Sequence, residues 1–357
     1  MILIILFKLR TLQSGTGYWF LIYVDSVLRG VLMEEKDYQD YIEEYKKLDK
    51  STGSEVYWFS FDDEIAYLRE RMKVIAANNQ PADKKVSVAI KTMQLERRML
   101  MNYYKAFSDR NIEFLNDVLF ENAHLLQMRQ ISDPGCDHGV FGMRVSTNLL
   151  AANLFEDVKK LLPFENGIAK YSPICTSIAN LLMAVLYDNR EFTKEAVDFA
   201  KKALGKKATQ YEKLHVECML AIVEKDCEAF NEKLELYCKV FKKNNDFFLI
   251  QLGKRFVIEA HGLYNLAKWA YDGEMKEKIV IPVADNFCQE LARYQDENNH
   301  VPGKIRHVYP EDLDFYNQLM VANPVKMHLV SRGKKLFVDT DRYLAEMISE
   351  NELKIII

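Results

Sequence analysis

The stretch "AIVEKDCEAFNEKLELYCKVF", residues 221–241, contains two helical segments separated by one polar turn. The first segment runs into Glu224 and Lys225, and the second begins after Asp226, a residue type that favours helix N-caps. Apolar side chains then recur at intervals of three and four residues, at Phe230, Leu234, Tyr237 and Phe241. That spacing places them on one face of a helix, so the stretch predicts an antiparallel helical hairpin.

A second hairpin is predicted just upstream. "NREFTKEAVDFAKKAL", residues 189–204, also follows a polar turn and an apolar helical segment, and it starts 37 residues before "DCEAFNEKLELYCKVF". Consecutive hairpins of this kind bury their apolar faces on one another, as in helical-repeat proteins. We therefore expect hairpins over 173–204 and 208–243, with one long helix over 246–272 packed against them.

The fold class follows from this periodicity. Eight Pro and fourteen Gly in 357 residues are few for a turn-rich β protein and suit long helices. We predict an all-α protein of stacked antiparallel helical hairpins, with at most a short strand near 334–340. Residues 33–357 are expected to form a single domain, with a possible sub-boundary at the loop 297–309.

Residues 84–108 show a regular seven-residue pattern that we interpret as one amphipathic helix. Its apolar stripe contains Val86, Met93, Leu100 and Phe107. A basic series recurs two positions earlier, at Lys84, Lys91, Arg98 and Lys105. At about 100° per residue the two series lie roughly opposite each other. We expect the basic series to be the solvated side of the helix, with a phosphate- or acid-binding ridge as the alternative.

Negative charge is concentrated in one part of the chain. The whole protein carries a net charge of −4, which argues against a general nucleic-acid binder. Residues 33–78 alone contain twelve Asp and Glu against seven Lys and Arg. An acidic surface of this kind either faces water or meets a basic partner. The candidate partner-binding residues are Glu34, Glu35, Asp37, Asp40, Glu43, Glu44, Asp62, Asp63 and Glu64.

Residues 1–32 have an unusual composition. "MILIILF" is short, and its basic residues follow it, whereas a secretory signal has them first. Residues 17–33 form a longer apolar segment, but Asp25 and Arg29 make it a poor membrane span. We expect residues 1–32 to be either an extension ahead of Met33 or an N-terminal packing segment, and we expect no membrane association.

No recognised catalytic or metal-binding motif is present. The most suggestive cluster is Cys136, Asp137 and His138 in "DPGCDHG", but neighbours in one loop rarely converge as ligands or as a nucleophile and its base. We interpret it as a turn, with a hydrolase or nuclease site as a minor alternative. His215 and His261 are predicted to be core histidines. The scattered cysteines are predicted to be reduced core residues of a cytoplasmic protein. We expect no metal, no cofactor and no enzymatic activity.

Residues 145–320 resemble one known family. The runs "SPICTSIANLLMAVLYDNREFTKEAVDFAKKAL", "YEKLHVECMLAIVEKDCEAFNEKLELYCKVFKK" and "IEAHGLYNLAKWAYDGE" look like the Immunity protein 49 family of bacterial polymorphic-toxin systems. The matching positions are apolar and structural: Leu181, Leu182, Ala184, Phe230, Leu234, Leu263 and Ala267. The N-terminal third and residues 325–357 show no resemblance to this family.

The resemblance implies a cytoplasmic, non-enzymatic helical protein that binds and neutralises a cognate toxin. It carries over no catalytic residue. The alternative is a tetratricopeptide-like scaffold or regulator that binds peptides, although the chain lacks that family's 34-residue consensus. The acidic residues of 33–78 are then the predicted toxin-facing surface, because toxins that act on nucleic acid tend to be basic.

Overall fold

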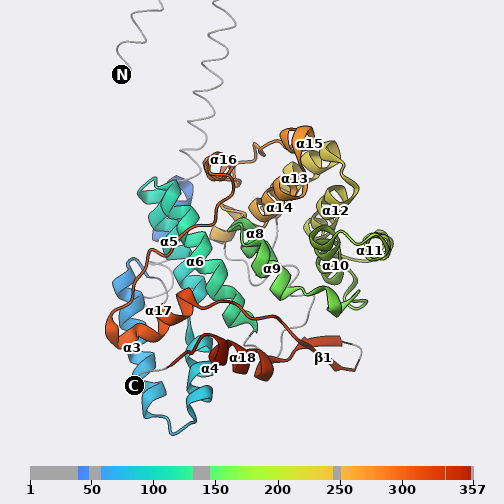
Figure 1. Cartoon of the computed structure of the whole chain (residues 1–357). Helices are drawn as coiled ribbons and strands as arrows, with labels where there is room; N and C mark the ends of the chain where they lie inside the picture. Colours follow the sequence, from blue (N-terminus) through green and yellow to red (C-terminus); the bar gives the residue numbers. More distant parts are fainter. Residues whose placement is uncertain (1–38, 48–57, 132–144, 244–250, 334, 355–357) are drawn as a thin grey trace, which may run out of the picture.

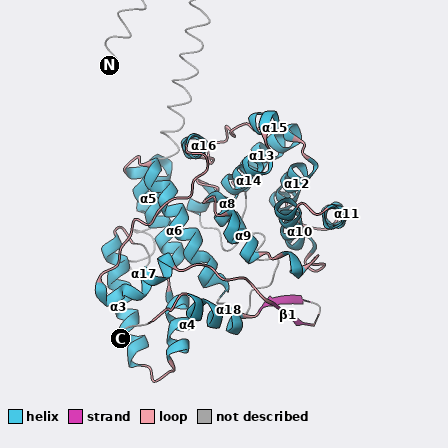
Figure 2. Cartoon of the chain, viewed as in Figure 1, coloured by secondary structure: helices cyan, strands magenta, loops and turns pink. Residues whose placement is uncertain are grey.

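The computed structural model describes residues 39–47, 58–131, 145–243, 251–333 and 335–354. Helices dominate these residues, and the strands form one short hairpin (Figure 1, Figure 2). The all-α fold class is therefore confirmed. Residues 1–32 and the Cys136–His138 loop lie outside the described residues.

The first part of the chain forms a layer of helices on the left of Figure 1. Residues 39–47 are helical. They are followed by α3 (Phe61–Ala77), α4 (Ala82–Thr92), α5 (Leu95–Ser108) and α6 (Ile112–Ile131). Two shorter helices then lead toward the middle of the molecule: α8 (Ser146–Ala151) and α9 (Phe155–Leu161), with the 3₁₀ turn η3 (Phe164–Asn166) after them.

The second part contains the predicted hairpins and a C-terminal segment that returns to the first part. The hairpins and their neighbours are α10 (Pro173–Tyr187), α11 (Arg190–Leu204), α12 (Gln210–Glu224), α13 (Cys227–Phe241), η4 (Gln251–Lys254) and α14 (Ile258–Ala270). The returning segment contains α15 (Gly273–Glu277), α16 (Gln289–Glu297), η5 (Glu311–Leu313), α17 (Asp314–Val321), β1 (Leu329–Arg332), β2 (Lys335–Val338) and α18 (Thr340–Glu350).

The two predicted hairpins are confirmed. α10 packs against α11, α12 packs against α13, and α10 and α12 join the pairs into what we call the helical stack, α10 to α14 (Figure 1). Each second helix starts at a capped turn: the side chain of Asn189 accepts from the amide of Phe192, and that of Asp226 accepts from the amide of Ala229. The polar turns seen in the sequence thus stop one helix and start the next.

The stack is joined to the first part through α8 and α14. A Cβ added to Gly262 on α14 would lie 2.4 Å from the carbonyl oxygen of Thr147 on α8. No real side chain fits at that distance, so glycine is what allows these two backbones to approach so closely. One hydrophobic cluster consequently runs through the described residues, from Tyr41 to Leu353.

The long helix predicted over 246–272 is wrong as a single element. Residues 251–254 form the 3₁₀ turn η4, and α14 begins only at Ile258. The backbone is extended at Val257, where the amide donates to the carbonyl of Asn286 at 3.1 Å instead of continuing a helix. The apolar residues Leu252, Phe256 and Leu263 of this segment are nevertheless all in the core.

The prediction of a single helix over 84–108 is also wrong. The backbone is extended at Met93, and this break separates α4 from α5. The strand predicted near 334–340 is confirmed as β2. Its partner β1 was not predicted, and the two strands pair antiparallel with Val330 opposite Phe337.

Candidate functional site

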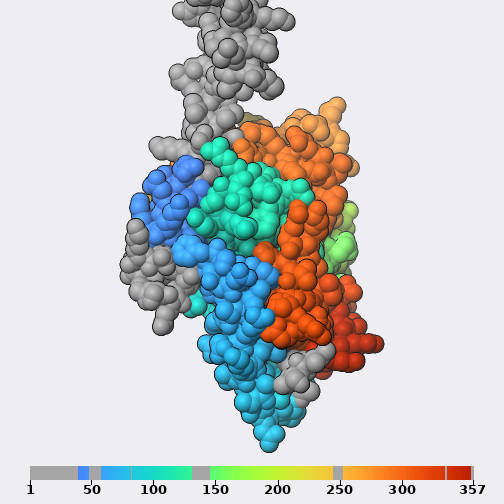
Figure 3. Space-filling view, turned by 90° about the vertical axis from the view of Figure 1, so that its left-hand side faces the viewer, coloured from blue at the N-terminus to red at the C-terminus, as the bar shows by residue number. Residues whose placement is uncertain are grey.

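The predicted acidic residues lie on two neighbouring segments. Asp40, Glu43 and Glu44 are on the helix 39–47, whereas Asp62 and Asp63 are in the first turn of α3. Figure 3 shows the helix 39–47 and α3 on the same side of the molecule. Glu34, Glu35 and Asp37 lie outside the described residues.

An aromatic cluster holds the two segments together. Tyr45 stacks on Tyr104 of α5, with ring centroids 4.6 Å apart, and meets the ring of Phe59 edge-on at 5.4 Å. The Tyr45 hydroxyl also donates to the carbonyl of Trp58. The residues just before α3 are therefore fixed against the helix 39–47, so the two acidic segments lie next to each other.

These carboxylates differ in how far they are already engaged. Arg255 approaches Asp40 at 3.3 Å and Glu44 at 2.6 Å, and all three side chains are partly buried. Asp63 accepts from the amides of Phe59 and Ser60 as part of a capping box. Glu43 and Asp62 remain exposed.

An exposed aromatic side chain belongs to the same region. Phe59 is 40% exposed although it touches Tyr45 and Tyr104, and it immediately precedes the acidic first turn of α3. We call this region the acidic face and define it by its five described carboxylates and one ring: Asp40, Glu43, Glu44, Asp62, Asp63 and Phe59.

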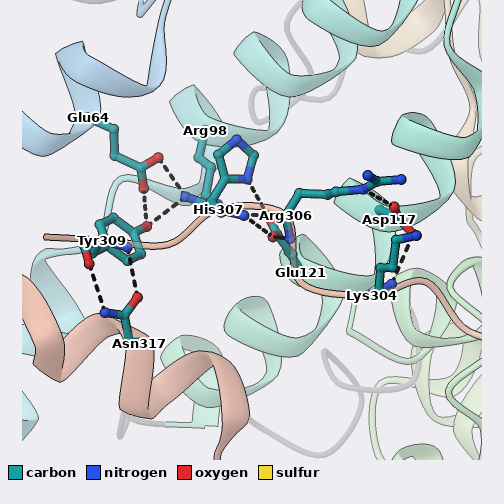
Figure 4. Close-up of polar contacts among 9 residues, drawn as sticks. All are labelled: Glu64, Arg98, Asp117, Glu121, Lys304, Arg306, His307, Tyr309 and Asn317. Atoms are coloured by element: carbon teal, nitrogen blue, oxygen red, sulfur yellow. Dashed lines mark hydrogen bonds and ion pairs between the residues drawn. The ribbon is translucent and has the colours of Figure 1, made fainter.

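Glu64 does not belong to the acidic face. The residue is only 4% exposed, so the prediction that it lies on a binding surface is wrong. Its carboxylate accepts from the Arg98 guanidinium at 2.6 Å and from the Tyr309 hydroxyl at 2.8 Å (Figure 4). A buried carboxylate needs such partners, and here α5 and the C-terminal segment supply them.

Arg98 is the centre of this buried network. It is 0% exposed, so the prediction that it belongs to a solvated basic side is wrong, whereas Lys84, Lys91 and Lys105 are indeed exposed. Its second terminal nitrogen donates to Glu121 of α6 at 2.7 Å. Lys105 lies seven residues farther along the same helix α5, so the helical face alone does not separate the two; α3, α6 and the C-terminal segment cover α5 at Arg98.

The network ties down an extended segment, residues 301–310, which we call the strap. The strap runs along α6 and presents its cations to carboxylates on that helix (Figure 4). Lys304 Nζ and Arg306 Nη2 reach Glu113 at 3.0 and 2.5 Å, and the Lys304 amide donates to Asp117 at 2.9 Å. Arg306 Nε also pairs with Asp117. The two pairs with Glu113 are partly exposed and add little stability individually, whereas Asp117 is buried.

Deeper along the strap, Glu121 makes three further contacts, all with residues of the strap. The amides of Arg306 and His307 donate to one of its oxygens at 2.5 and 2.9 Å, and His307 Nδ1 lies 2.6 Å from the other. Tyr309 then exchanges two hydrogen bonds with the side-chain amide of Asn317 on α17. The strap thus connects the C-terminal segment to α3, α5 and α6.

The charges of the network stabilise one another. Burial alone disfavours a charged guanidinium, but Glu64, Tyr309 and Glu121 outweigh it and raise the pKa of Arg98 above its ordinary value. Burial likewise opposes the charged form of Glu121, yet His307 and Arg98 hold the pKa of that carboxyl below its usual range. Both groups are therefore charged in the folded state. The contacts drawn in Figure 4 join residues of this chain to one another.

The two histidines and four of the five described cysteines singled out in the sequence are core residues, whereas Cys175 is only half-buried. His215 and His261 are 2% and 0% exposed, and burial lowers their pKa values to about 4 and about 3. Cys218, Cys227, Cys238 and Cys288 are buried and form no disulfide bond. Among the described residues, no group of three or more His, Cys, Asp or Glu is arranged to hold a metal ion.

Within the described part of the chain, no helix combines the length and the apolar composition that a membrane span requires. Comparisons with protein-family models, with curated proteins and with solved structures gave no match.

Proposed function

We propose that this chain is a cytoplasmic, non-enzymatic immunity protein that binds a basic toxin and neutralises it by contact. The observation that carries the proposal is the acidic face. There, the exposed ring of Phe59 stands among carboxylates on a rigid aromatic support.

The composition of this face suits a protein partner. Aromatic side chains that are held in place and partly exposed are frequent anchors of binding energy. Surrounding carboxylates speed the approach of a basic surface and penalise acidic partners. Glu43 and Asp62 are the two carboxylates most available for this role. Glu43 is exposed and its ion pair with Lys47, at 3.8 Å, lies on the surface, whereas Asp40, Glu44 and Asp63 are held by partners within the fold.

The alternative is a tetratricopeptide-like scaffold, and the two stacked hairpins favour it. Such scaffolds bind peptides on the concave surface of their stacked hairpins. Here α10 is buried along most of its length, from Ile174 to Leu186, because other helices cover it. The helical stack therefore offers less open surface for that role than the acidic face does, and we favour the immunity proposal.

Co-expression tests the proposal. The candidate toxin is the product of the gene next to the one that encodes this chain. We expect the unaltered protein to restore growth of cells that express this toxin. The variant Phe59→Ala/Glu43→Lys/Asp62→Lys should fail to do so while it keeps its helical fold, checked by circular dichroism. No rescue by the unaltered protein would contradict the immunity function, whereas full rescue by the variant would remove the acidic face from it.

A further inference from the structure

A groove of about 620 Å³ lies between α4 and α18, at the β1–β2 hairpin. Figure 1 shows these elements together at the lower edge of the molecule. α4 lines the groove with one stripe of its surface, because the spacing of Lys84, Ser87, Val88 and Lys91 puts them on one face of the helix. The volume is that of a small-molecule site. None of the described lining residues belongs to the acidic face, so the two sites are separate.

The apolar part of the lining is aliphatic. It contains Val88 of α4, Leu344 and Ile348 of α18, and Val330 and Val338 of the hairpin. Leu344 and Val338 are buried, whereas the other three are half-buried. The described lining residues include no aromatic ring. An alkyl chain therefore suits this surface better than a planar ring does.

Two lysines of the lining have no carboxylate partner. Lys84 and Lys91 are exposed, and neither forms an ion pair within the described part of the chain. Lys84 lies in the first turn of α4, where the positive end of the helix dipole disfavours a cation. An anion in the groove would offset this cost. Arg332 adds a third, exposed cation, whose guanidinium lies 5.2 Å from the centre of the Phe337 ring.

The carboxylates of the lining already serve the helix starts. Asp83 and Asp341 lie in the first turns of α4 and α18, where the helix dipoles favour negative charge. Asp339 is the N-cap of α18 and accepts from the amide of Arg342. These three carboxylates equal the three cations in number. The lining therefore accommodates a single negative charge more easily than the two charges of a phosphate.

The start of α18 supplies hydrogen-bond donors for such an anion. Thr340 is 8% exposed, and its hydroxyl has no hydrogen-bond partner in the part of the chain that the structure describes. A buried hydroxyl without a partner destabilises the fold, so a ligand that accepts from it gains an interaction that the free protein lacks. The amides of Thr340 and Asp341 also have no partner within the helix, because they belong to its first turn.

We propose that this groove binds a small molecule that carries an alkyl chain and a single carboxylate. The carboxylate accepts from the Thr340 hydroxyl and from the first amides of α18, and the ammonium groups of Lys84 and Lys91 supply the opposite charge. The alkyl chain covers the aliphatic surface of Val88, Leu344 and Ile348. This binding does not depend on the proposed immunity function.

Isothermal titration calorimetry of the full chain with decanoate, kept below the concentration at which it forms micelles, tests the proposal. We expect saturable binding at one site. Decyltrimethylammonium pairs a similar alkyl chain with a cationic head and should bind at least about tenfold more weakly. The proposal is overturned if decanoate does not bind. Equal binding of the two probes would also overturn it, because the carboxylate would then not be recognised.

Substitutions locate the site on the molecule. Lys84→Gln/Lys91→Gln should weaken decanoate binding at least about tenfold. Lys202→Gln/Lys206→Gln makes the same charge change on α11 and just after it, and should leave binding within about twofold. Ala345→Trp, at an exposed position that lines the groove, should block the alkyl chain. Normal binding by both Lys84→Gln/Lys91→Gln and Ala345→Trp would place decanoate elsewhere and overturn the proposal.

Thr340→Val tests where the carboxylate lies. Because the hydroxyl has no partner to lose in the free protein, this variant should keep the melting temperature. It should nevertheless weaken decanoate binding by about tenfold. A lowered melting temperature with unchanged affinity would make Thr340 a structural residue and would overturn the assignment of the carboxylate to the start of α18.

Discussion

The helical stack and the N-terminal layer are held together by different interactions. In the stack, α10 to α14 pack mainly through apolar stripes. In the layer of α3, α5 and α6, a buried arginine joins two carboxylates and anchors the strap. Burial of apolar surface tolerates small displacements, whereas a buried ion pair needs every partner in place. The N-terminal layer should therefore be the more sensitive of the two to single substitutions.

The largest effect is expected at Arg98. Arg98→Met leaves the carboxylates of Glu64 and Glu121 buried without their cation, which should cost about 3–5 kcal/mol in the free energy of unfolding. Chemical denaturation measures this cost. Lys91→Met is the matched control from the same seven-residue series, and its exposed side chain should change stability by less than about 0.5 kcal/mol. Equal effects of the two substitutions would contradict the structural role of the network.

A cavity in the helical stack should have a comparable but more variable effect. Leu263 on α14 is 0% exposed, and Leu263→Ala should cost about 2–5 kcal/mol because the neighbouring helices collapse only partly into the space. Denaturation curves again provide the measurement. A loss below 1 kcal/mol would show that α14 is not a tightly packed part of the core.

As the pH falls, the helical stack should lose stability before the network around Arg98 does. His215 and His261 have pKa values of about 4 and about 3 in the folded protein, far below the unfolded value of about 6.5. The unfolded chain therefore binds protons first, and stability should fall as the pH drops from about 6.5 toward 4, on the order of 2–3 kcal/mol for each histidine. His124 on α6, with a pKa of about 4, adds to this slope.

Glu121 behaves differently, because its folded pKa is lowered. It contributes stability above its unfolded pKa and loses it only as the pH falls further, toward the lower folded value. Between pH 6.5 and 5 the slope should thus be flattened by His215→Gln or His261→Gln and left unchanged by Glu121→Gln. The opposite pattern would assign the acid sensitivity to the network.

The smallest of these effects concerns the fit of the strap on α6. A Cβ on Gly303 would lie 2.6 Å from the carbonyl oxygen of Asn116, so Gly303→Ala must push the strap outward and should cost about 1–3 kcal/mol without removing any charge. Gly205→Ala is the control, because a Cβ there meets its nearest atom at an ordinary 3.5 Å. Melting temperatures of the two variants distinguish them, and indistinguishable values would show that the strap is loosely seated.

The same contrast explains what the sequence predicts well. The hairpins of the helical stack were predictable because their apolar residues recur at helical spacing between polar turns. The acidic stretch was also visible, but composition does not say which carboxylates face inward. Glu64 shares a stripe with Leu68 and Ile75, both buried, and that spacing was the available sign that it is an interior residue.

No comparable pattern in the sequence predicts that Arg98 is buried, that a break separates α4 from α5, or that the strap lies along α6. The partners of Arg98 are 34 and 23 residues away along the chain, and the Tyr309 contact spans 211 residues. Periodicity describes one helix at a time, so it cannot reveal a pairing that only the folded arrangement creates. The exposed ring of Phe59 has the same origin, since its support comes from Tyr45 and Tyr104.

The central claim is that the acidic stretch divides into interior carboxylates that hold the fold and exterior ones that bind a basic toxin. The most direct test is the association rate with the product of the adjacent gene, measured at several salt concentrations. Glu43→Lys/Asp62→Lys should slow association by about tenfold at low salt and flatten the salt dependence. Glu228→Lys/Glu232→Lys makes the same charge change on the stack and should leave the rate within about twofold. Equal rates for the two variants would contradict the claim.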